Sequence, residues 1–228
     1  MLDNKGFAIS TILYALLLMA TLVIFLLIGN FGFERNTTSE FVSNIKNELN
    51  GRDEVVDSSS ASVVDDSDNV SGYLTDISGE IITLDEKFKI ISTVNESYVI
   101  NIEGNRVSTN NSNISLYIAD NLEGQEFSLV ESDDIGYYYI AQASNKTFVF
   151  DIAGASSANN TNIQLYTLNN SNAQKFRFVE TEDEGVYYIK SSLGTCVDLT
   201  NASVANNANI ASYSCNKSAA QKWKLMIV

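Results

Sequence analysis

The carboxy-terminal part of the chain repeats one pattern three times. A glutamine, a variable residue and an aromatic residue recur at 125–127, 174–176 and 221–223, with spacings of 49 and 47 residues. Two further elements recur in the same order. An Asn-Ile stretch ending in tyrosine occupies 113–117, 162–166 and 209–213, and an aromatic-x-Ile element opens each unit at 88–90, 138–140 and 187–189. This repetition indicates three structural units rather than chance composition.

Each unit holds short alternating runs that clusters of Asn, Gly and Ser interrupt, which predicts strands and turns. Units of this length would also suit propeller blades, but three copies are fewer than the usual four to eight blades. Three copies fit a threefold barrel capped by hairpins. We therefore expect an all-β domain over residues 73–228, with repeats at about 87–133, 134–183 and 184–228.

The composition excludes several classes of function. The chain has 28 acidic and 14 basic residues, and it has no histidine. Such an acidic protein does not suit nucleic acid, whose recognition needs Lys and Arg at the phosphates. The lack of histidine removes Ser-His-Asp and Cys-His catalysis and the commonest zinc ligand. We expect no metal, no cofactor and no enzymatic activity.

Residues 7–28 form an uncharged apolar run. At the helical rise of about 1.5 Å per residue, this run reaches roughly 33 Å, enough to cross a hydrocarbon core of about 30 Å. It is longer than the apolar region of a secretory signal, and no small-x-small cleavage site follows it. We therefore expect an uncleaved single-pass anchor at 1–33 in the cell membrane. The charges that flank the run favour a cytoplasmic N-terminus and an extracellular C-terminal domain.

Residues 34–72 connect the predicted anchor to the predicted β domain. Phe41, Ile45 and Leu49 fall at i, i+4 and i+8, which indicates a short juxtamembrane helix. The following stretch, 53–71, is rich in Asp and Ser and has no basic residue. Because it has little apolar surface to bury, we expect it to be a flexible acidic linker.

The repeats resemble the β-trefoil of ricin B-type lectins. The resemblance rests on the Gln-x-aromatic repeats, the Asn-Ile-Gln-Leu-Tyr stretch at 162–166 and an Asp-x-x-Gly stretch at 151–154, and it covers roughly 140 of the 228 residues. It implies a three-repeat β-trefoil that binds glycans or glycoconjugates. It also implies that the aromatic residues of the repeats, Phe127, Phe176 and Trp223, belong to the core.

The resemblance implies a sugar site in each intact repeat. The family uses an aspartate, a polar residue thirteen positions later and an aromatic residue two positions further on. Repeat 2 supplies Asp151, Gln164 and Tyr166, and the residues Asn172 and Gln174 near its Gln-x-aromatic element complete the predicted main site. In such sites, polar side chains bond the sugar hydroxyls while the aromatic face contacts the apolar side of the sugar.

The other two repeats depart from this pattern. Repeat 3 keeps Asp198 and Tyr213 but lacks the central glutamine, so we expect a weaker site there. Repeat 1 has Asn101 and Ser115 in place of the aspartate and the glutamine and keeps only Tyr117. We expect that repeat 1 has lost its site.

The family commonly carries a disulfide at the positions that Cys196 and Cys215 occupy, so the resemblance implies a bond between them. The bond would close a loop of about twenty residues, worth about 3 kcal/mol in the chain-entropy model. It would persist in an oxidising compartment, which agrees with an exported domain. We also expect it to close part of the pocket of repeat 3.

The N-terminus resembles a second family. Lys5, Gly6 and Phe7, followed at once by the apolar run, are similar to the leader of type IV pilin-like proteins. In that family a peptidase cuts after the glycine, although the glutamate five residues into the mature chain is Thr11 here. The resemblance implies an alternative function, a pilin-like structural subunit with pilus partners, a trefoil head and little or no sugar binding.

Overall fold

The computed structural model describes residues 60–64 and 70–228. The chain divides into two units, Met1–Val55 and Val56–Val228. The predicted anchor at 1–33 and the predicted juxtamembrane helix lie outside the described residues. Within the described ranges, no helix is both long and apolar enough to cross a membrane.

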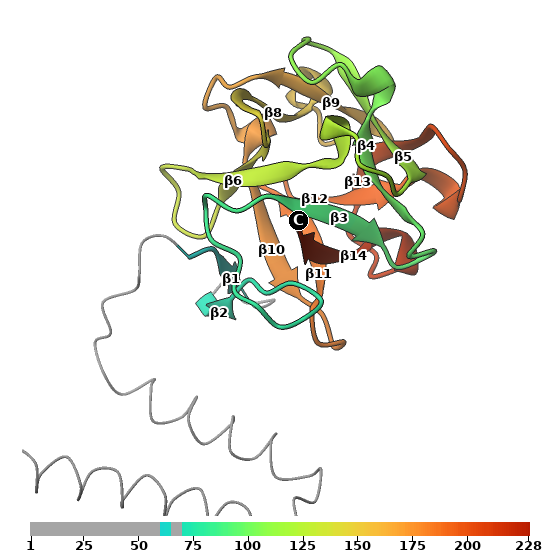
Figure 1. Cartoon of the computed structure of the whole chain (residues 1–228). Coiled ribbons are helices and arrows are strands. Elements are labelled where there is room, and N and C mark those ends of the chain that lie inside the picture. The colour runs from blue at the N-terminus through green and yellow to red at the C-terminus, as the bar shows by residue number, and fades with distance from the viewer. Residues whose placement is uncertain (1–59, 65–69) are drawn as a thin grey trace, which may run out of the picture. The chain divides into compact units, whose positions relative to one another are not determined.

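Six strands form a closed barrel, to which each repeat contributes its first and last strand (Figure 1). They are β3 (Phe88–Ser92), β6 (Phe127–Glu131), β7 (Tyr138–Gln142), β10 (Phe176–Glu180), β11 (Val186–Ser191) and β14 (Lys222–Ile227). The antiparallel ladder runs in that order and closes from β14 back to β3. Every barrel strand thus has two neighbours, which leaves no open edge.

Three hairpins cap one end of this barrel. They are β4–β5 (Tyr98–Ile102, Ser112–Ile118), β8–β9 (Asn145–Ile152, Thr161–Thr167) and β12–β13 (Thr195–Leu199, Ala208–Ser214). The second strands pair with one another in a triangle, β5 with β9, β9 with β13 and β13 with β5. A six-stranded barrel with a triangular cap is a β-trefoil, and the predicted fold of the repeats is confirmed.

Short 3-10 helices sit at two equivalent places in each repeat. One follows the first strand of each hairpin: η1 (Glu103–Asn105), η3 (Ala153–Ala155) and η5 (Thr200–Ala202). The other precedes the last barrel strand: η2 (Glu123–Gln125), η4 (Asn172–Gln174) and η6 (Ala219–Gln221). The two helices of a repeat lie against each other beside the hairpin.

The aromatic residues of the Gln-x-aromatic elements lie in the core, as predicted. Phe127, Phe176 and Trp223 are fully buried. Phe150 packs edge-on against Phe127 and Phe176, at ring-centroid distances of 5.1 and 6.3 Å. The isoleucine of each Asn-Ile stretch is also fully buried, at Ile114, Ile163 and Ile210. The repeated sequence elements are therefore mainly the threefold core.

Asparagines at equivalent positions join neighbouring repeats. The side-chain oxygens of Asn110, Asn159 and Asn206 accept hydrogen bonds from the backbone N–H groups of Thr167, Ser214 and Ile118, at 2.8, 2.7 and 3.0 Å. The asparagine that follows each of them, at 111, 160 and 207, adopts a φ of 63°. Asparagine tolerates this left-handed conformation better than most residues, so each Asn-Asn pair combines a clamp with a tight turn.

Residues N-terminal to the first repeat belong to the same unit. Strand β1 (Ser62–Val64) pairs in parallel with β10, and β2 (Val70–Tyr73) pairs with β1. The Tyr138 hydroxyl lies 2.8 Å from Ser62 Oγ, and the Tyr187 hydroxyl lies 2.8 Å from Thr75 Oγ1. Three fully buried residues of this segment, Ala61, Leu74 and Ile82, pack into the barrel core.

This arrangement corrects two predictions. Residues 60–64 are part of the trefoil rather than of the flexible linker at 53–71, and the trefoil therefore begins before residue 73. The linker prediction is wrong there because Ala61, Val63 and Val64 form an apolar run too short to stand out among the surrounding Ser and Asp residues. Val64 is buried against Val179 and Tyr188, more than one hundred positions away, and the backbone of Ala61 bonds Leu74 and Ile82.

Ion pairs lie between the barrel turns and the middle residue of the Gln-x-aromatic elements. Lys175 Nζ lies 2.7 Å from a carboxylate oxygen of both Asp133 and Asp134, and the two carboxylates raise the pKa of the lysine. Lys222 pairs in the same way with Glu182 and Asp183. The equivalent residue of repeat 1 is an acid, Glu126, which pairs with Lys87 instead. Repeat 1 has thus reversed the charge of this position and kept an ion pair.

Candidate functional site

Repeat 3 has an open surface hollow of about 490 Å³ beside its predicted site. It is bordered by Asp198, by Tyr213, by the loops that contain η5 and η6, and by Asn160 from repeat 2. Asp198 lies on β12 directly across the hairpin from Ala211. The structure therefore brings the two predicted residues of repeat 3 together in one open pocket.

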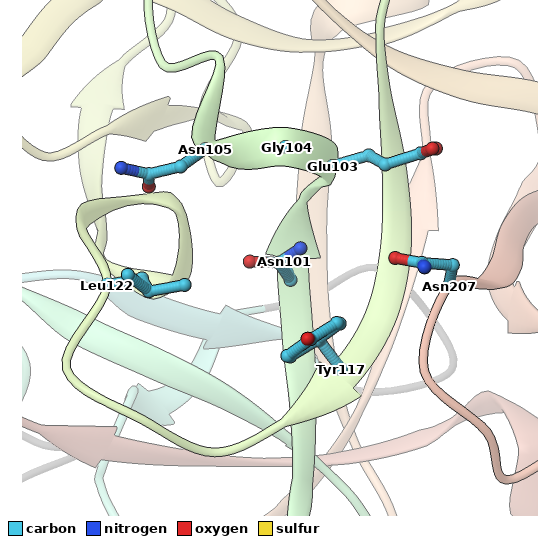
Figure 2. Close-up of a pocket in the computed structure, with 7 residues that line it drawn as sticks. All are labelled: Asn101, Glu103, Gly104, Asn105, Tyr117, Leu122 and Asn207. Atoms are coloured by element: carbon cyan, nitrogen blue, oxygen red, sulfur yellow. The ribbon is translucent and has the colours of Figure 1, made fainter.

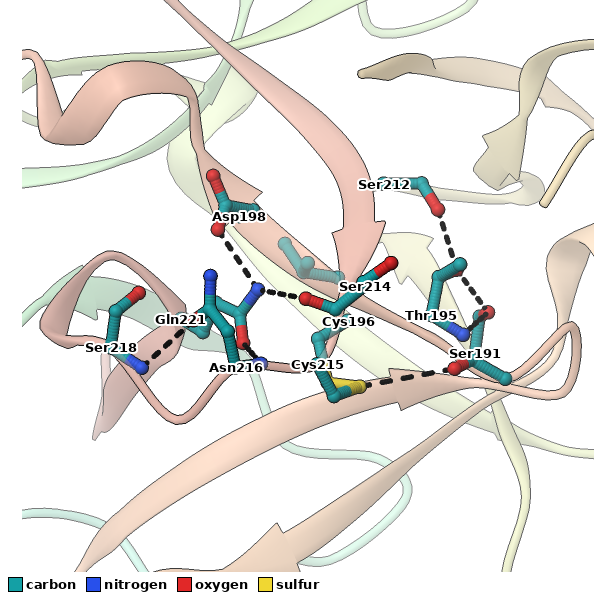
Figure 3. The surroundings of a disulfide bond; sticks show 12 residues. Ser191, Thr195, Cys196, Asp198, Ser212, Ser214, Cys215, Asn216, Ser218 and Gln221 are labelled. Atoms are coloured by element: carbon teal, nitrogen blue, oxygen red, sulfur yellow. Dashed lines mark hydrogen bonds between the residues drawn. A yellow bond between two sulfur atoms is a disulfide. The ribbon is translucent and has the colours of Figure 1, made fainter. Parts of the chain in front are cut away.

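A buried glutamine holds Asp198 in place (Figure 3). Gln221 Nε2 donates to Asp198 Oδ2 at 2.9 Å and to the Ser214 carbonyl at 3.0 Å, while Gln221 Oε1 accepts from Asn216 N at 2.8 Å. Asp198 is only 7% exposed, and this burial raises its pKa despite the opposing hydrogen bond from Gln221. Its second oxygen, Oδ1, is left to accept a hydrogen bond from a ligand.

Repeat 2 repeats this arrangement at the predicted main site. Gln174 Nε2 donates to Asp151 Oδ2 at 3.1 Å, and Gln164 Nε2 donates to Asp151 Oδ1 at 3.0 Å. Asp151 pairs with Gln164 across the hairpin, so both carboxylate oxygens are bonded. Tyr166 lies two residues after Gln164 on β9 and is half-buried. The structure thus brings Asp151 and Gln164 into contact.

The two remaining residues of the predicted main site differ in their exposure. Asn172 is exposed at the start of η4, where its side chain is accessible. Gln174 is fully buried. Its amide bonds Asp151, the Thr167 carbonyl and Asn169 N. Gln174 therefore has no surface to offer a ligand, and we reassign it from a ligand-binding to a positioning residue.

Repeat 1 also has a hollow, of about 320 Å³, at the equivalent place (Figure 2). Asn101 and Tyr117 border it, together with residues of η1, Leu122 and Asn207 from repeat 3. Gln125 Nε2 donates to the Ile118 carbonyl at 2.9 Å, as its counterparts do to Thr167 and Ser214. The replacements at Asn101 and Ser115 have therefore changed the chemistry of this hollow without closing it.

Residues of neighbouring repeats complete the hollows. Asn160, in the β8–β9 turn of repeat 2, borders the hollow of repeat 3, and Asn207, in the β12–β13 turn of repeat 3, borders that of repeat 1. Sequence reasoning treated each repeat as a separate site and missed both residues. The Asn-Asn pair that recurs in each repeat is a sequence signal for these residues. The folded structure is needed to show that the second asparagine of a pair borders the hollow of the next repeat.

The predicted disulfide is present between Cys196 and Cys215, whose Cα atoms lie 5.1 Å apart. The two cysteines border a separate cavity of about 50 Å³ with Tyr188 and Lys190. Neither borders the 490 Å³ hollow of repeat 3. The prediction that the bond closes part of that hollow is wrong, because both half-cystines border the smaller cavity with Gln221 and neither borders the hollow with Asp198.

The fold and its hollows define a class, a three-repeat β-trefoil with an open polar pocket beside a tyrosine in at least two repeats. The model of the ricin-type β-trefoil lectin domain-like family matches residues 82–166 and 172–228, more than half of the chain. The protein belongs to this family. Membership points to carbohydrate binding in general and to a binding protein rather than an enzyme. No curated protein matches the chain.

Solved structures share the fold. The designed threefold-symmetric protein ThreeFoil aligns with a TM-score of 0.58 at 22% identity, over 62% of this chain and 99% of its own. The Rhizoctonia solani agglutinin aligns at 0.55 and 17%, over 63% and 95%. The exo-β-1,3-galactanase from Clostridium thermocellum aligns at 0.59 and 23%, over 66% of this chain and 32% of the galactanase. At these identities the similarity establishes the fold alone.

Proposed function

We propose that the protein binds glycans through the hollow of repeat 3, with Asp198 and Tyr213, and through the equivalent surface of repeat 2, with Asp151, Gln164 and Tyr166. The observation that carries the proposal is the carboxylate of Asp198. Asp198 is almost buried, a buried glutamine fixes one of its oxygens, and the residue borders an open hollow together with Tyr213. A fixed acceptor beside an aromatic face suits a ring with hydroxyls on one side and C–H groups on the other.

The chemistry of these hollows suits binding rather than reaction. Retaining and inverting glycosidases place two carboxyl groups on either side of one glycosidic bond. In this chain, Asp151 and Asp198 belong to hairpins of different repeats, and each is tied to its own glutamine. The sites of repeats 2 and 3 therefore each offer one such carboxylate, which can orient a sugar hydroxyl.

We also propose that the helix predicted at 7–28 anchors the protein in the cell membrane and displays the trefoil outside. The uncharged length of this segment and the disulfide between Cys196 and Cys215 support the proposal, since disulfides persist in oxidising compartments. Display would suit shallow pockets, because several weak sites on one surface gain apparent affinity from multivalency. Mass spectrometry of the mature N-terminus tests it. A chain that begins at Phe7 would favour the pilin-like alternative over a simple anchor.

The binding proposal is tested with the full chain in detergent on a glycan array. The full chain is needed because a fragment that starts at Lys87 would lack the core residues Ala61, Leu74 and Ile82. We expect binding to fall at least tenfold in the variant Asp151→Ala/Tyr166→Ala/Asp198→Ala/Tyr213→Ala. Ile135→Ala is the matched control, since Ile135 is 93% exposed in a barrel turn and should leave binding unchanged. Full binding by the quadruple variant would refute these sites.

A further inference from the structure

Repeats 2 and 3 differ at the place where the hairpin meets the barrel. In repeat 2, five apolar and aromatic residues pack together there. In repeat 3, a disulfide and a lysine occupy equivalent positions and border a cavity of about 50 Å³. The five positions, in repeat 2 and then in repeat 3, are Val130 and Val179, Tyr139 and Tyr188, Ala141 and Lys190, Val149 and Cys196, and Leu168 and Cys215.

We propose that the disulfide of repeat 3 is a redox switch for the hollow of that repeat. A small thiol opens the bond on the folded protein, and the opening loosens the loop at 215–218, which walls the hollow. The effect on sugar affinity rests on the proposed glycan binding. The chemistry of the bond and the loosening of the loop do not rest on it and can be measured without a sugar.

The two cysteines differ in their exposure. Cys215 is exposed, whereas Cys196 is only 3% exposed. A thiolate that attacks a disulfide bonds to one sulfur and expels the other as a thiolate. Because Cys215 is the accessible partner, the new bond forms at its Sγ atom, and Cys196 is the thiolate that leaves.

Lys190 favours this direction of cleavage. It lies directly across the β11–β12 pairing from Cys196 and borders the same cavity as both cysteines. A neighbouring ammonium group lowers the pKa of a thiol, and a thiol with a lower pKa is expelled faster. Repeat 2 has Ala141 at this position, so the fold itself does not require the charge.

Two small thiols supply the electrons for the reaction. The first thiolate bonds to Cys215 Sγ, the bond between Cys215 Sγ and Cys196 Sγ breaks, and the Cys196 thiolate takes a proton from solvent. The second thiolate attacks the small-thiol sulfur of the mixed disulfide and expels the Cys215 thiolate, which is protonated in turn. The protein gains two thiol groups, and the two small thiols leave as one disulfide.

The bond ties one wall of the hollow to the strand that carries Asp198 (Figure 3). Cys196 lies two residues before Asp198 on β12, and Cys215 begins the loop that leads to η6. In this loop Asn216 borders the hollow, and its backbone N–H donates to Gln221 Oε1 at 2.8 Å. Once the bond opens, β12 no longer restrains the loop, so this hydrogen bond breaks more often.

The fold does not need the bond to close this loop. Repeat 2 closes the equivalent loop without a disulfide, through the same hydrogen bond from Asn169 N to Gln174 Oε1 at 2.8 Å. There, the apolar packing of Val149 and Leu168 takes the place of the bond. Reduced repeat 3 would have neither the bond nor this packing. Its loop would keep its path but would be held less firmly.

The first test follows reduction of the folded full chain in detergent by 2-mercaptoethanol. Iodoacetamide traps the released thiols, and mass spectrometry of the peptides locates the mixed disulfide. We expect a rate proportional to the thiol concentration and a mixed disulfide at Cys215. A rate that stops rising with thiol concentration would show that the bond opens only after unfolding. That result, or a mixed disulfide at Cys196, would overturn the proposal.

The variant Lys190→Gln tests the lysine. Lys146→Gln is the matched control, because it removes one positive charge from an exposed position on the hairpin of repeat 2. We expect Lys190→Gln to slow the first step about threefold, since about half of a pKa change of roughly one unit appears in the rate. The control should keep the rate of the unmodified protein. Equal rates in the two variants would overturn the role of Lys190.

Amide hydrogen exchange, read by NMR, tests the loosening of the loop. In the reduced protein and in Cys196→Ser/Cys215→Ser, the backbone N–H of Asn216 should exchange about tenfold faster than in the oxidised protein. The N–H of Asn169, its counterpart in repeat 2, should keep its rate. An unchanged rate at Asn216 in both open forms would overturn the switch.

A glycan array tests the effect on binding. The variant Asp151→Ala/Tyr166→Ala, which leaves repeat 3 as the proposed site, is applied in its oxidised and reduced forms. We expect the reduced form to bind about fivefold more weakly, because a loosened wall is less preorganised. Equal binding by the two forms would overturn the switch. If the oxidised form bound no glycan, the proposed function would fail for repeat 3, and the exchange rate of Asn216 would still decide on the loosening.

Discussion

Repeats 1 and 3 have the same order of strands and 3-10 helices, but they differ in one residue of the hollow, which is Asn101 in repeat 1 and Asp198 in repeat 3. In repeat 3 the buried glutamine, Gln221, bonds the carboxylate of Asp198, whereas in repeat 1 the glutamine keeps its bond to the Ile118 carbonyl but makes none to Asn101. The glutamine therefore has two separable roles. It closes the loop before the last barrel strand in every repeat, and it fixes the ligand acceptor only where that acceptor is an aspartate.

We expect the disulfide to be the largest difference in stability between the two repeats, because only repeat 3 has one. We expect Cys196→Ser/Cys215→Ser to lower the free energy of unfolding by about 3 kcal/mol, the value for a loop of this length. Urea unfolding of the full chain, followed by the fluorescence of its single tryptophan, Trp223, measures the change. A loss below about 1 kcal/mol would mean that strand pairing alone holds the β12–β13 hairpin.

The two roles of the glutamine predict unequal effects of its removal. Gln221→Ala should destabilise the protein by about 2 kcal/mol more than Gln125→Ala, since it also leaves the buried Asp198 without its hydrogen bond. The same urea unfolding compares both variants. Equal losses would show that loop closure is the whole contribution of this residue.

The raised pKa of Asp198 predicts a pH dependence of binding in repeat 3. As the pH falls through this pKa, which lies above 3.8, the carboxylate takes up a proton and loses acceptor capacity. We expect the sugar affinity of repeat 3 to fall by up to about tenfold per pH unit below the pKa. An NMR titration that follows the methyl signal of Ala220, which borders this hollow, measures the affinity. Asp198→Asn, which installs the residue of repeat 1, should bind more weakly at neutral pH and lose this fall. An unchanged fall in that variant would assign the titration to another group.

The clamps between repeats should give the smallest effect. Asn159 Oδ1 accepts from both the N–H and the hydroxyl of Ser214, at 2.7 Å each, whereas Asn206 Oδ1 accepts from Ile118 N alone, at 3.0 Å. We expect Asn159→Ala to cost about 1 kcal/mol more than Asn206→Ala in urea unfolding. The reverse order would show that the hydroxyl bond adds nothing to the clamp.

The fold could be predicted from the sequence because the repeated residues are the ones that fill the threefold core. Phe127, Phe176 and Trp223 recur at a fixed spacing, and each is buried in the barrel. The disulfide followed from the family resemblance. The pairing of β1 with β10 could not be predicted, because it joins Val64 to Val179 and depends on contacts between residues far apart in the chain.

The candidate site was predicted less completely than the fold. Asp151 and Gln164 are in contact and Asp198 borders a hollow, whereas the burial of Gln174 depends on how η4 packs beneath the hairpin. The prediction that repeat 1 has lost its site rested on the replacements at Asn101 and Ser115 alone. Its hollow depends on loop geometry and on Asn207 from another repeat, which no comparison within one repeat reveals.

The entry of the chain into the barrel has a mechanical consequence. Tension applied N-terminal to Ser60 would reach the barrel through the β1–β10 pairing and the contacts of Ser62 with Tyr138 and of Thr75 with Tyr187. All of these partners lie on barrel strands, and none lies on the hairpins that carry the hollows. If the molecule is held by its N-terminal end, a pulling force would therefore act on the barrel strands. The hairpins that carry the hollows would keep their shape under that force.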